Sequence, residues 1–172
     1  SEDYAIKLAT DLIDNFKNIY EDKWLNMMRG KLGLIGEHKN DKKLATDLLN
    51  WMEKNKVDYT NTFCHLMNID TKDNIYKKKD FLNWTKEWEK RSELNNSNKE
   101  KKIKLMKKNN PLIIPRNHIV EEALAKAENG DLDKIKDLLK VLKDPLNDQT
   151  KITKYQMPAP ISNEKYQTYC GT

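Results

Sequence analysis

Residues 110–145 read NPLIIPRNHIVEEALAKAENGDLDKIKDLLKVLKDP, a stretch that predicts two consecutive helices joined by a short turn. Pro115 suits a first helical position, because the N–H that proline lacks would have no partner there. Gly130 can adopt the left-handed conformation that closes a helix, and Asp131 can cap the next one. Pro145 prevents the second helix from continuing. This order of start and stop signals favours a helical hairpin.

Apolar side chains recur at helical spacing in both halves of the hairpin, so we expect each helix to have one face for packing. In the first half they are Ile119, Val120, Ala123, Leu124 and Ala127. In the second half they are Leu132, Ile135, Leu138, Leu139 and Leu142.

Helical patterns also account for most of the remaining chain, and no sustained alternation typical of β-strands occurs. The predicted helices lie near 4–20, near 22–32, from Asn40 or Asp41 to Met52, from Asp58 to Met67, from Phe81 to Trp88 and over 99–108. Asn68–Lys79 is predicted to be a loop. The predicted fold is therefore all-α, with about eight helices. They form one irregular domain over residues 1–148, followed by an extended tail over 149–172.

Composition narrows the class of protein further. The 172 residues suffice for one domain with a core, and 37% hydrophobic against 34% charged residues indicates a very polar surface. No apolar run approaches the ~18 residues of a membrane-spanning helix, so we expect no membrane contact. The first residues are acidic, without methionine or a signal peptide, so we expect a processed product or a piece of a longer protein.

Two sequence patterns that could indicate catalysis fail on their spacing. Gly30–Gly36 contains GKLGLIG, but a phosphate loop needs glycine at position 25 and Ser or Thr at position 32, where leucines stand. Cys64 and His65 are neighbours, and adjacent helical positions do not face each other. The remaining histidines have no metal-ligand spacing, and we expect His118 to be a hydrogen-bonded packing residue.

Residues 97–108 carry six lysines against one glutamate, which leaves the rest of the chain near neutral in a total of +5. Two interpretations are open: a solvated helix face, or a patch that faces nucleotides or nucleic acid. Base stacking would require exposed aromatic side chains among the lysines. We expect Phe81, Trp84 and Trp88 to lie in the core instead, so nucleic acid is not the expected partner.

Five segments contain sequence motifs that are typical of one protein family, and they follow one another along the chain. They are MRGKLGL at 28–34, DYTNTF at 58–63, the tryptophan helix with Trp84, Trp88 and Arg91, PRNHIVEEALAKAENGD at 115–131, and the tail from Pro158 to TYCGT at 168–172. In this order they resemble the C-terminal region of the SelO/YdiU family, the selenoprotein O family of kinase-like protein adenylyltransferases. Two positions depart from the pattern: Cys64 replaces an arginine, and Leu146–Asp148 replaces Tyr-Asp-Glu.

The resemblance implies that the whole protein transfers AMP from ATP to Ser, Thr or Tyr hydroxyls of other proteins, with Mg²⁺ or Mn²⁺. In the family the catalytic groups lie in a kinase-like domain N-terminal to the matched region. The motifs HGVxNTDN and DYGP do not occur here. We therefore expect no catalytic, cofactor-binding or metal-binding residue in this chain, and no activity from it alone. The implied partners are that kinase-like domain and the protein substrates.

Two other functions stay open at this point. One is a non-catalytic helical module that binds a partner protein, and the other is a basic nucleic-acid-binding domain. Arg29, Arg91 and Arg116 are the only arginines, and each falls in a matching segment. Because an arginine fork holds a carboxylate by two bonds, we expect all three to be structural clamps.

The two cysteines, Cys64 and Cys170, do not define a disulfide framework, so a reducing compartment, the bacterial cytoplasm, is expected. Cys170 stands third from the end, near the point where the resemblance places cysteine or selenocysteine. The resemblance thus makes Cys170 a candidate redox residue, able to form a disulfide with the kinase-like domain. The alternative is an inert terminal thiol.

Overall fold

The computed structural model describes residues 1–69, 73–95, 98–146 and 154–159. Within these ranges every regular element is helical: seven α-helices and one short 3-10 helix, with no strand. The all-α prediction is confirmed. No helix in the described ranges is both long enough and apolar enough to cross a bilayer.

The first helix, α1, runs without a break over Glu2–Leu32. The sequence interpretation of two helices, near 4–20 and 22–32, was therefore wrong. Residues 20–23 contain neither Gly nor Pro, so nothing there stops the hydrogen-bond ladder. Gly33 ends α1 as predicted: its φ of 67° is left-handed, and its N–H donates to the carbonyls of Arg29 and Gly30.

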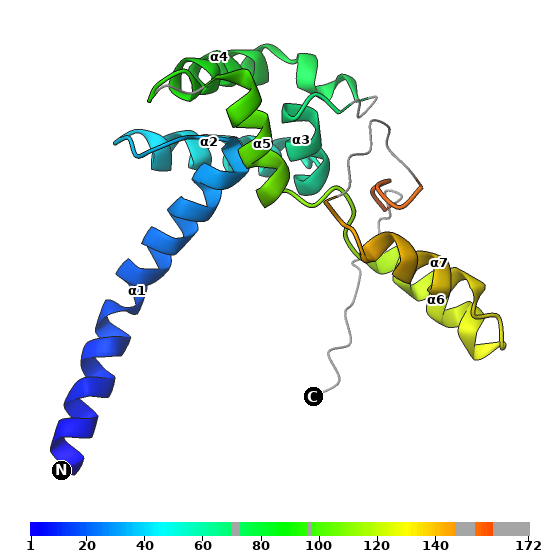
Figure 1. Cartoon of the computed structure of the whole chain (residues 1–172), viewed down its shortest axis with the longest axis horizontal. Helices are drawn as coiled ribbons and strands as arrows, with labels where there is room; N and C mark the ends of the chain where they lie inside the picture. Colours follow the sequence, from blue (N-terminus) through cyan, green and yellow to red (C-terminus); the bar gives the residue numbers. More distant parts are fainter. Residues whose placement is uncertain (70–72, 96–97, 147–153, 160–172) are drawn as a thin grey trace.

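The body of the molecule is built around the C-terminal end of α1 (Figure 1). Its other elements are α2 (Asp41–Asn55), α3 (Tyr59–Leu66), the 3-10 helix η1 (Asn74–Lys77), α4 (Lys79–Ser92) and α5 (Lys99–Asn109). Met28 and Leu32 of α1 are fully buried with Leu48 of α2 and Met106 of α5. The N-terminal half of α1 extends away from this body.

The predicted aromatic core is confirmed, since Phe81, Trp84 and Trp88 are all buried. Both indole N–H groups are satisfied: Trp84 donates to the carbonyl of Leu44 at 3.0 Å, and Trp88 donates to that of Leu32 at 2.8 Å. Burial of a tryptophan normally requires such a partner. These bonds attach α4 to α2 and to the end of α1.

The predicted loop at Asn68–Lys79 contains η1, which the sequence pattern did not reveal. One turn of 3-10 helix is too short to show a period. Tyr76 in η1 is buried, and its ring stacks on His65 with the centroids 4.0 Å apart. Its hydroxyl lies 3.2 Å from that of Thr62. The Asp73 side chain caps η1 by accepting the N–H of Ile75 at 2.9 Å, and the contacts of Tyr76 attach the segment to α3.

The hairpin forms as α6 (Asn117–Glu128) and α7 (Asp133–Leu142), and it projects from the body (Figure 1). Gly130 has a φ of 84°, as predicted, and Asp131 Oδ1 accepts the N–H of Asp133 at 3.1 Å. Pro115 is not the first helical residue, because α6 starts two positions later.

Burial in the hairpin differs from the expectation. Within the two helices only Ala123 and Leu138 are buried, while Leu124, Leu132 and Leu139 are about half exposed. Two helices that pack mainly on each other can cover only their facing sides. The periodicity therefore identified the apolar faces but not which part of each face is covered.

Of the predicted tail, the structure describes residues 154–159, and Cys170 lies outside the described ranges. Residues 154–156 form a turn within the predicted tail. Gln156 is fully buried at this turn. The predicted start of α2 at Asn40 or Asp41 is confirmed, although the side chain of the N-cap residue Asn40 makes no bond to the helix.

Candidate functional site: two carboxylates and their arginines

Asp41 lies at the first position of α2, and its side chain is fully buried. Arg29 from the end of α1 donates from Nε to Oδ2 at 2.8 Å. Arg91 from α4 donates from Nε to Oδ1 at 2.6 Å and from Nη2 to Oδ2 at 3.2 Å. The backbone N–H of His38 adds a fourth bond at 2.9 Å. One carboxylate thus joins α1, α2, α4 and the loop between α1 and α2.

The electrostatics of Asp41 follow from these contacts. Burial alone would raise the pKa of the carboxyl, since it disfavours the charged form. The hydrogen bonds from Arg91, Arg29 and the His38 N–H outweigh burial and hold the pKa of Asp41 below its usual value. Arg91 also donates from Nη2 to the carbonyl of Gly36 at 3.1 Å, which fixes the loop.

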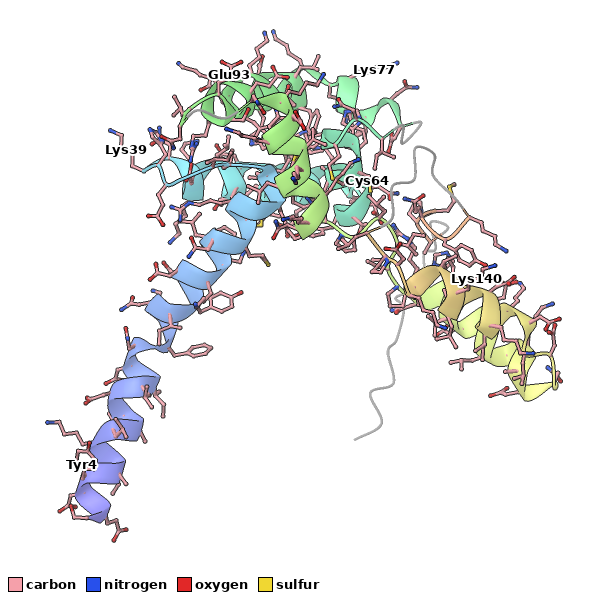
Figure 2. The ribbon with its side chains drawn as sticks, in the orientation of Figure 1. Tyr4, Lys39, Cys64, Lys77, Glu93 and Lys140 are labelled. Carbon is pink, nitrogen blue, oxygen red and sulfur yellow. The ribbon has the colours of Figure 1, made fainter. Side chains whose placement is uncertain are left out.

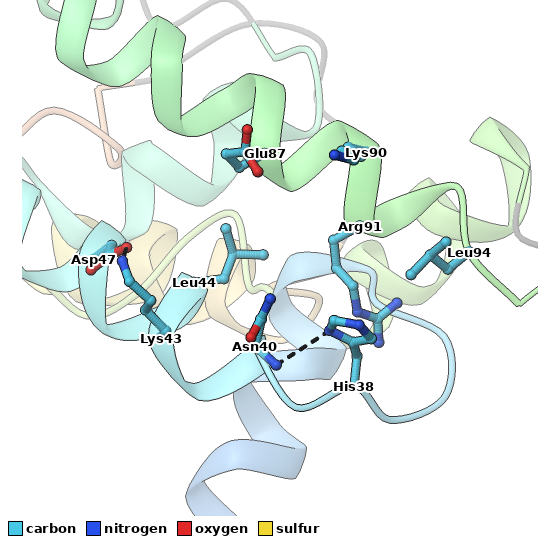
Figure 3. Close-up of a pocket in the computed structure, with 9 residues that line it drawn as sticks. All are labelled: His38, Asn40, Lys43, Leu44, Asp47, Glu87, Lys90, Arg91 and Leu94. Atoms are coloured by element: carbon cyan, nitrogen blue, oxygen red, sulfur yellow. Dashed lines mark hydrogen bonds and ion pairs between the residues drawn. The ribbon is translucent and has the colours of Figure 1, made fainter.

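A surface pocket of about 500 Å³ opens beside this cluster, between the start of α2 and the end of α4 (Figure 3). Its lining residues are His38, Asn40, Lys43, Leu44, Asp47, Glu87, Lys90, Arg91 and Leu94. Lys43 is paired with Asp47 at 2.5 Å, and His38 Nδ1 accepts the N–H of Asn40 at 3.2 Å. The charges in the pocket are of both signs, and Arg91 is already bound to Asp41. The pocket therefore shows no preference for one charged ligand.

The second carboxylate, Asp58, caps α3 by accepting the N–H of Asn61 at 2.8 Å, as the sequence predicted. Arg116, directly before α6, holds it by two bonds: Nη1 to Oδ2 at 2.6 Å and Nη2 to Oδ1 at 3.1 Å. Burial raises the pKa of Asp58, but the Arg116 fork and the Asn61 N–H lower it more. This fork attaches the base of the hairpin to α3.

Gln156 continues this attachment. Its side-chain amide donates to the backbone carbonyl of Leu112 at 2.9 Å. Its backbone carbonyl accepts from the side-chain amide of Asn61 at 3.1 Å. The N–H of Leu112 in turn donates to the carbonyl of Pro145 at 2.6 Å. The segment before α6, the end of the hairpin, residues 154–159 and α3 therefore meet at one polar junction.

The lysines of α5 lie in two different environments, one partly buried and one exposed to solvent. Lys102 is half-buried, with Nζ 4.3 Å from the centroid of the Trp88 ring and 3.2 Å from Ser92 Oγ. Burial lowers the pKa of Lys102, while Glu89 and Glu93 oppose that shift. Lys99, Lys101, Lys104 and Lys108 are exposed. The helix thus packs through one side and carries its charge on the other.

Cys64 is fully buried on α3 beside Phe63. Burial raises the pKa of this thiol to about 11, and the nearby Asp58 adds to the effect. A thiol so far from ionisation at neutral pH is a poor nucleophile. Among the described residues, no group of three or more His, Cys, Asp or Glu side chains is placed to hold a metal ion.

Comparison with known proteins assigns the chain to a family. The sequence model of the family described as protein adenylyltransferase SelO matches residues 5–143, most of the chain. The chain belongs to the SelO family. It is 51% identical to the protein nucleotidyltransferase YdiU of Pelagibacter ubique, and the match covers 100% of this chain and 36% of that relative.

Two further bacterial relatives bear the same name. The one from Nitrosococcus oceani is 41% identical, with 98% of this chain and 34% of the relative covered. The one from Bacillus cereus is 42% identical, and the match covers 99% of this chain and 36% of that relative. The chain therefore spans about a third of the length of the SelO relatives it matches.

Sequence reasoning named the three arginines but not the carboxylates that they bind. In this SelO chain Arg29 and Arg91 converge on Asp41, and Arg116 binds Asp58. Both aspartates stand at helix starts, where aspartate is common because it can cap a helix. Their presence there therefore did not indicate that they bind arginines. Gln156 was missed entirely, since nothing in the tail sequence marks a buried amide.

Proposed function

We propose that this chain forms the C-terminal helical part of a protein adenylyltransferase. The match of residues 5–143 to the SelO family carries the proposal, together with relatives named as nucleotidyltransferases that are about three times as long. In the proposed reaction a Ser, Thr or Tyr oxygen of a protein attacks the α-phosphorus of ATP. A new O–P bond to AMP forms, pyrophosphate leaves, and the hydroxyl loses its proton.

The proposal places the ATP and the divalent metal of that reaction outside this chain. No suitable cluster of metal ligands occurs among the described residues, and Asp41 and Asp58 are both occupied by arginines. We therefore assign no reaction step to this chain. Mg²⁺ or Mn²⁺ and ATP belong to the rest of the polypeptide, which has the kinase-like character of the family. The part described here supports that domain.

The test compares this chain with the complete polypeptide that its gene encodes. Each is incubated with ATP labelled in the α-phosphate, Mg²⁺ or Mn²⁺, and an acceptor protein. We expect label on protein with the complete polypeptide and none with the chain alone. Label transferred by the chain alone would show that it contains an active site. No transfer by the complete polypeptide, tested over a panel of acceptors, would reject adenylylation itself.

One alternative function has structural support. Leu124, Leu132 and Leu139 are large apolar side chains exposed on the projecting hairpin. Such a surface suits a non-catalytic module that binds a partner protein. This alternative predicts protein binding by the complete polypeptide without AMP transfer, so the same assay separates the two functions.

The compartment and the regulation are part of the same proposal. The bacterial relatives and the free, buried Cys64 are consistent with a reducing cytoplasm. We propose Cys170 as a redox switch that forms a disulfide with a cysteine of the kinase-like domain. The check is adenylylation by the complete polypeptide with and without reductant, in the natural protein and in Cys170→Ser. An equal response of both proteins would exclude Cys170 as the switch.

A further inference from the structure

Every fourth residue of α1 is a large apolar side chain. The eight residues are Tyr4, Leu8, Leu12, Phe16, Tyr20, Trp24, Met28 and Leu32. Helical residues four apart are surface neighbours, and a row of them forms a ridge inclined to the helix axis. A single apolar ridge therefore runs along the whole length of α1.

The environment of the ridge changes along the helix. Leu32 and Met28 are 0% and 1% exposed in the core, and Trp24 is partly buried against it. Tyr20, Phe16 and the residues before them are about half exposed or more, with Phe16 at 64%. Figure 2 shows Tyr4 near the far end of α1, well away from the body. The outer ridge, Tyr4–Tyr20, thus continues a buried surface into solvent.

This exposure is unusual for a stable element. In proteins, most of the stability of a helix comes from tertiary packing of its apolar face. Phe16 and Tyr20 stack on each other, with centroids 6.2 Å apart, but the described residues give the outer ridge no cover beyond its own neighbours. A contiguous exposed apolar surface of this kind marks an interaction site.

Charge limits the possible occupants. Residues 1–22, which carry the outer ridge, hold six acidic side chains against two lysines. A second copy paired along this ridge would bring like charges together, which opposes association. A surface that complements the outer ridge is therefore apolar and bordered by Lys or Arg side chains. SelO relatives contain about two thirds of their length outside the region matched by this chain, and that portion can provide such a surface.

We propose that the outer ridge of α1 docks onto the part of the SelO polypeptide that lies outside this chain. The occupant is an apolar surface flanked by basic side chains. A ridge of residues four apart fits between the side-chain rows of another helix, at a crossing angle of about −50°. The inference rests on the family assignment and on the longer polypeptide, but not on AMP transfer.

The test is thiol labelling in a Cys170→Ser background, where the buried Cys64 is the one cysteine left in this chain. Labelling of each introduced thiol is read from its own peptide by mass spectrometry, so cysteines elsewhere in the complete polypeptide do not contribute. Phe16→Cys places a thiol on the outer ridge. Asn18→Cys places one almost opposite Phe16, because side chains two positions apart in a helix point in directions about 200° apart. Each variant is made in this chain and in the complete polypeptide. Protection is expected for Phe16→Cys in the complete polypeptide alone, by roughly tenfold or more, since labelling then requires local opening.

The other outcomes each reject the proposal. Equal labelling of Phe16→Cys in both proteins would show that the rest of the polypeptide does not cover the ridge. Protection in this chain alone that rises with protein concentration would identify a second copy as the occupant. Protection of Asn18→Cys together with Phe16→Cys would show burial on all sides. Leu12→Cys and Asp14→Cys repeat the comparison if a first variant fails to fold, and no assay measures ATP or AMP.

Discussion

Arg91 holds the buried carboxylate of Asp41 in a fork, although the two residues stand 50 positions apart in the sequence. The bond from Nε to Oδ1 is 2.6 Å long and that from Nη2 to Oδ2 is 3.2 Å. Arg29 approaches the same carboxylate from α1. Three helices are thereby fixed around one negative charge, which is why we expect stability to depend on this cluster.

Replacing Arg91 by lysine should destabilise the fold although the charge is kept. A lysine ammonium cannot form the planar two-bond contact, so at least one bond to Asp41 is lost in a buried place. We expect a loss of about 1–3 kcal/mol in the free energy of unfolding, measured with urea. Lys43→Gln, which removes an exposed ion pair with Asp47, is the control and should change little. Equal effects would argue against the clamp.

The lowered pKa of Asp41 and Asp58 predicts the acid response. Their folded pKa lies below the unfolded one, so their contribution is full above the unfolded pKa of about 3.9 and is lost as pH falls through the folded pKa. Stability should therefore decline below about pH 4. Asp41→Asn should lose roughly 3–5 kcal/mol at pH 7 and show a shallower decline in acid. If the free energy of unfolding fell equally steeply with pH in Asp41→Asn and in the natural protein, Asp41 would be excluded as a source of the acid sensitivity.

The fork between Arg116 and Asp58 should hold the base of the hairpin. Arg116→Lys leaves Asp58 with fewer bonds, so amide hydrogens at the starts of α3 and α6 should exchange faster. A double-mutant cycle with Asp58→Asn should give a coupling of about 0.5–3 kcal/mol. Additive effects of the two changes would show that the contact contributes nothing of its own.

Leu138 and Leu139 form a matched pair on α7. Leu138 is 7% exposed, whereas Leu139 is 56% exposed. Leu138→Ala should cost roughly 2–5 kcal/mol through lost burial and a cavity. Leu139→Ala removes a side chain from solvent and should stay within about 0.5 kcal/mol. Thermal or urea unfolding of both variants measures the difference, and a reversed order would mean that α7 is rotated about its axis.

Two left-handed glycines should respond differently to alanine. At Gly130 an added Cβ meets no atom within 4 Å, so only backbone strain of about 1–2 kcal/mol is expected. At Gly33 the Cβ would lie 2.6 Å from Lys102 Cγ and 2.9 Å from its carbonyl oxygen. Gly33→Ala should therefore cost more, because α5 must move from α1. Similar melting temperatures for both variants would contradict this close contact.

At the candidate site, the sequence predicted half of each contact. The three arginines were identified because they are rare and lie in family-like segments. Their carboxylates could not be chosen among 27 acidic residues, since no local rule links Arg91 to Asp41. The buried Gln156 had no signal at all, because its partners Leu112 and Asn61 are distant in the chain.

The sequence by itself determined the family, the all-α class and most helix ends. These features depend on local spacing and on glycine conformation, as at Gly33 and Gly130. Only the tertiary structure decided that the outer ridge of α1 is exposed, and that Leu138 rather than Leu139 is covered. Periodicity shows which side of a helix is apolar. Which part of that side loses its water depends on where distant segments lie.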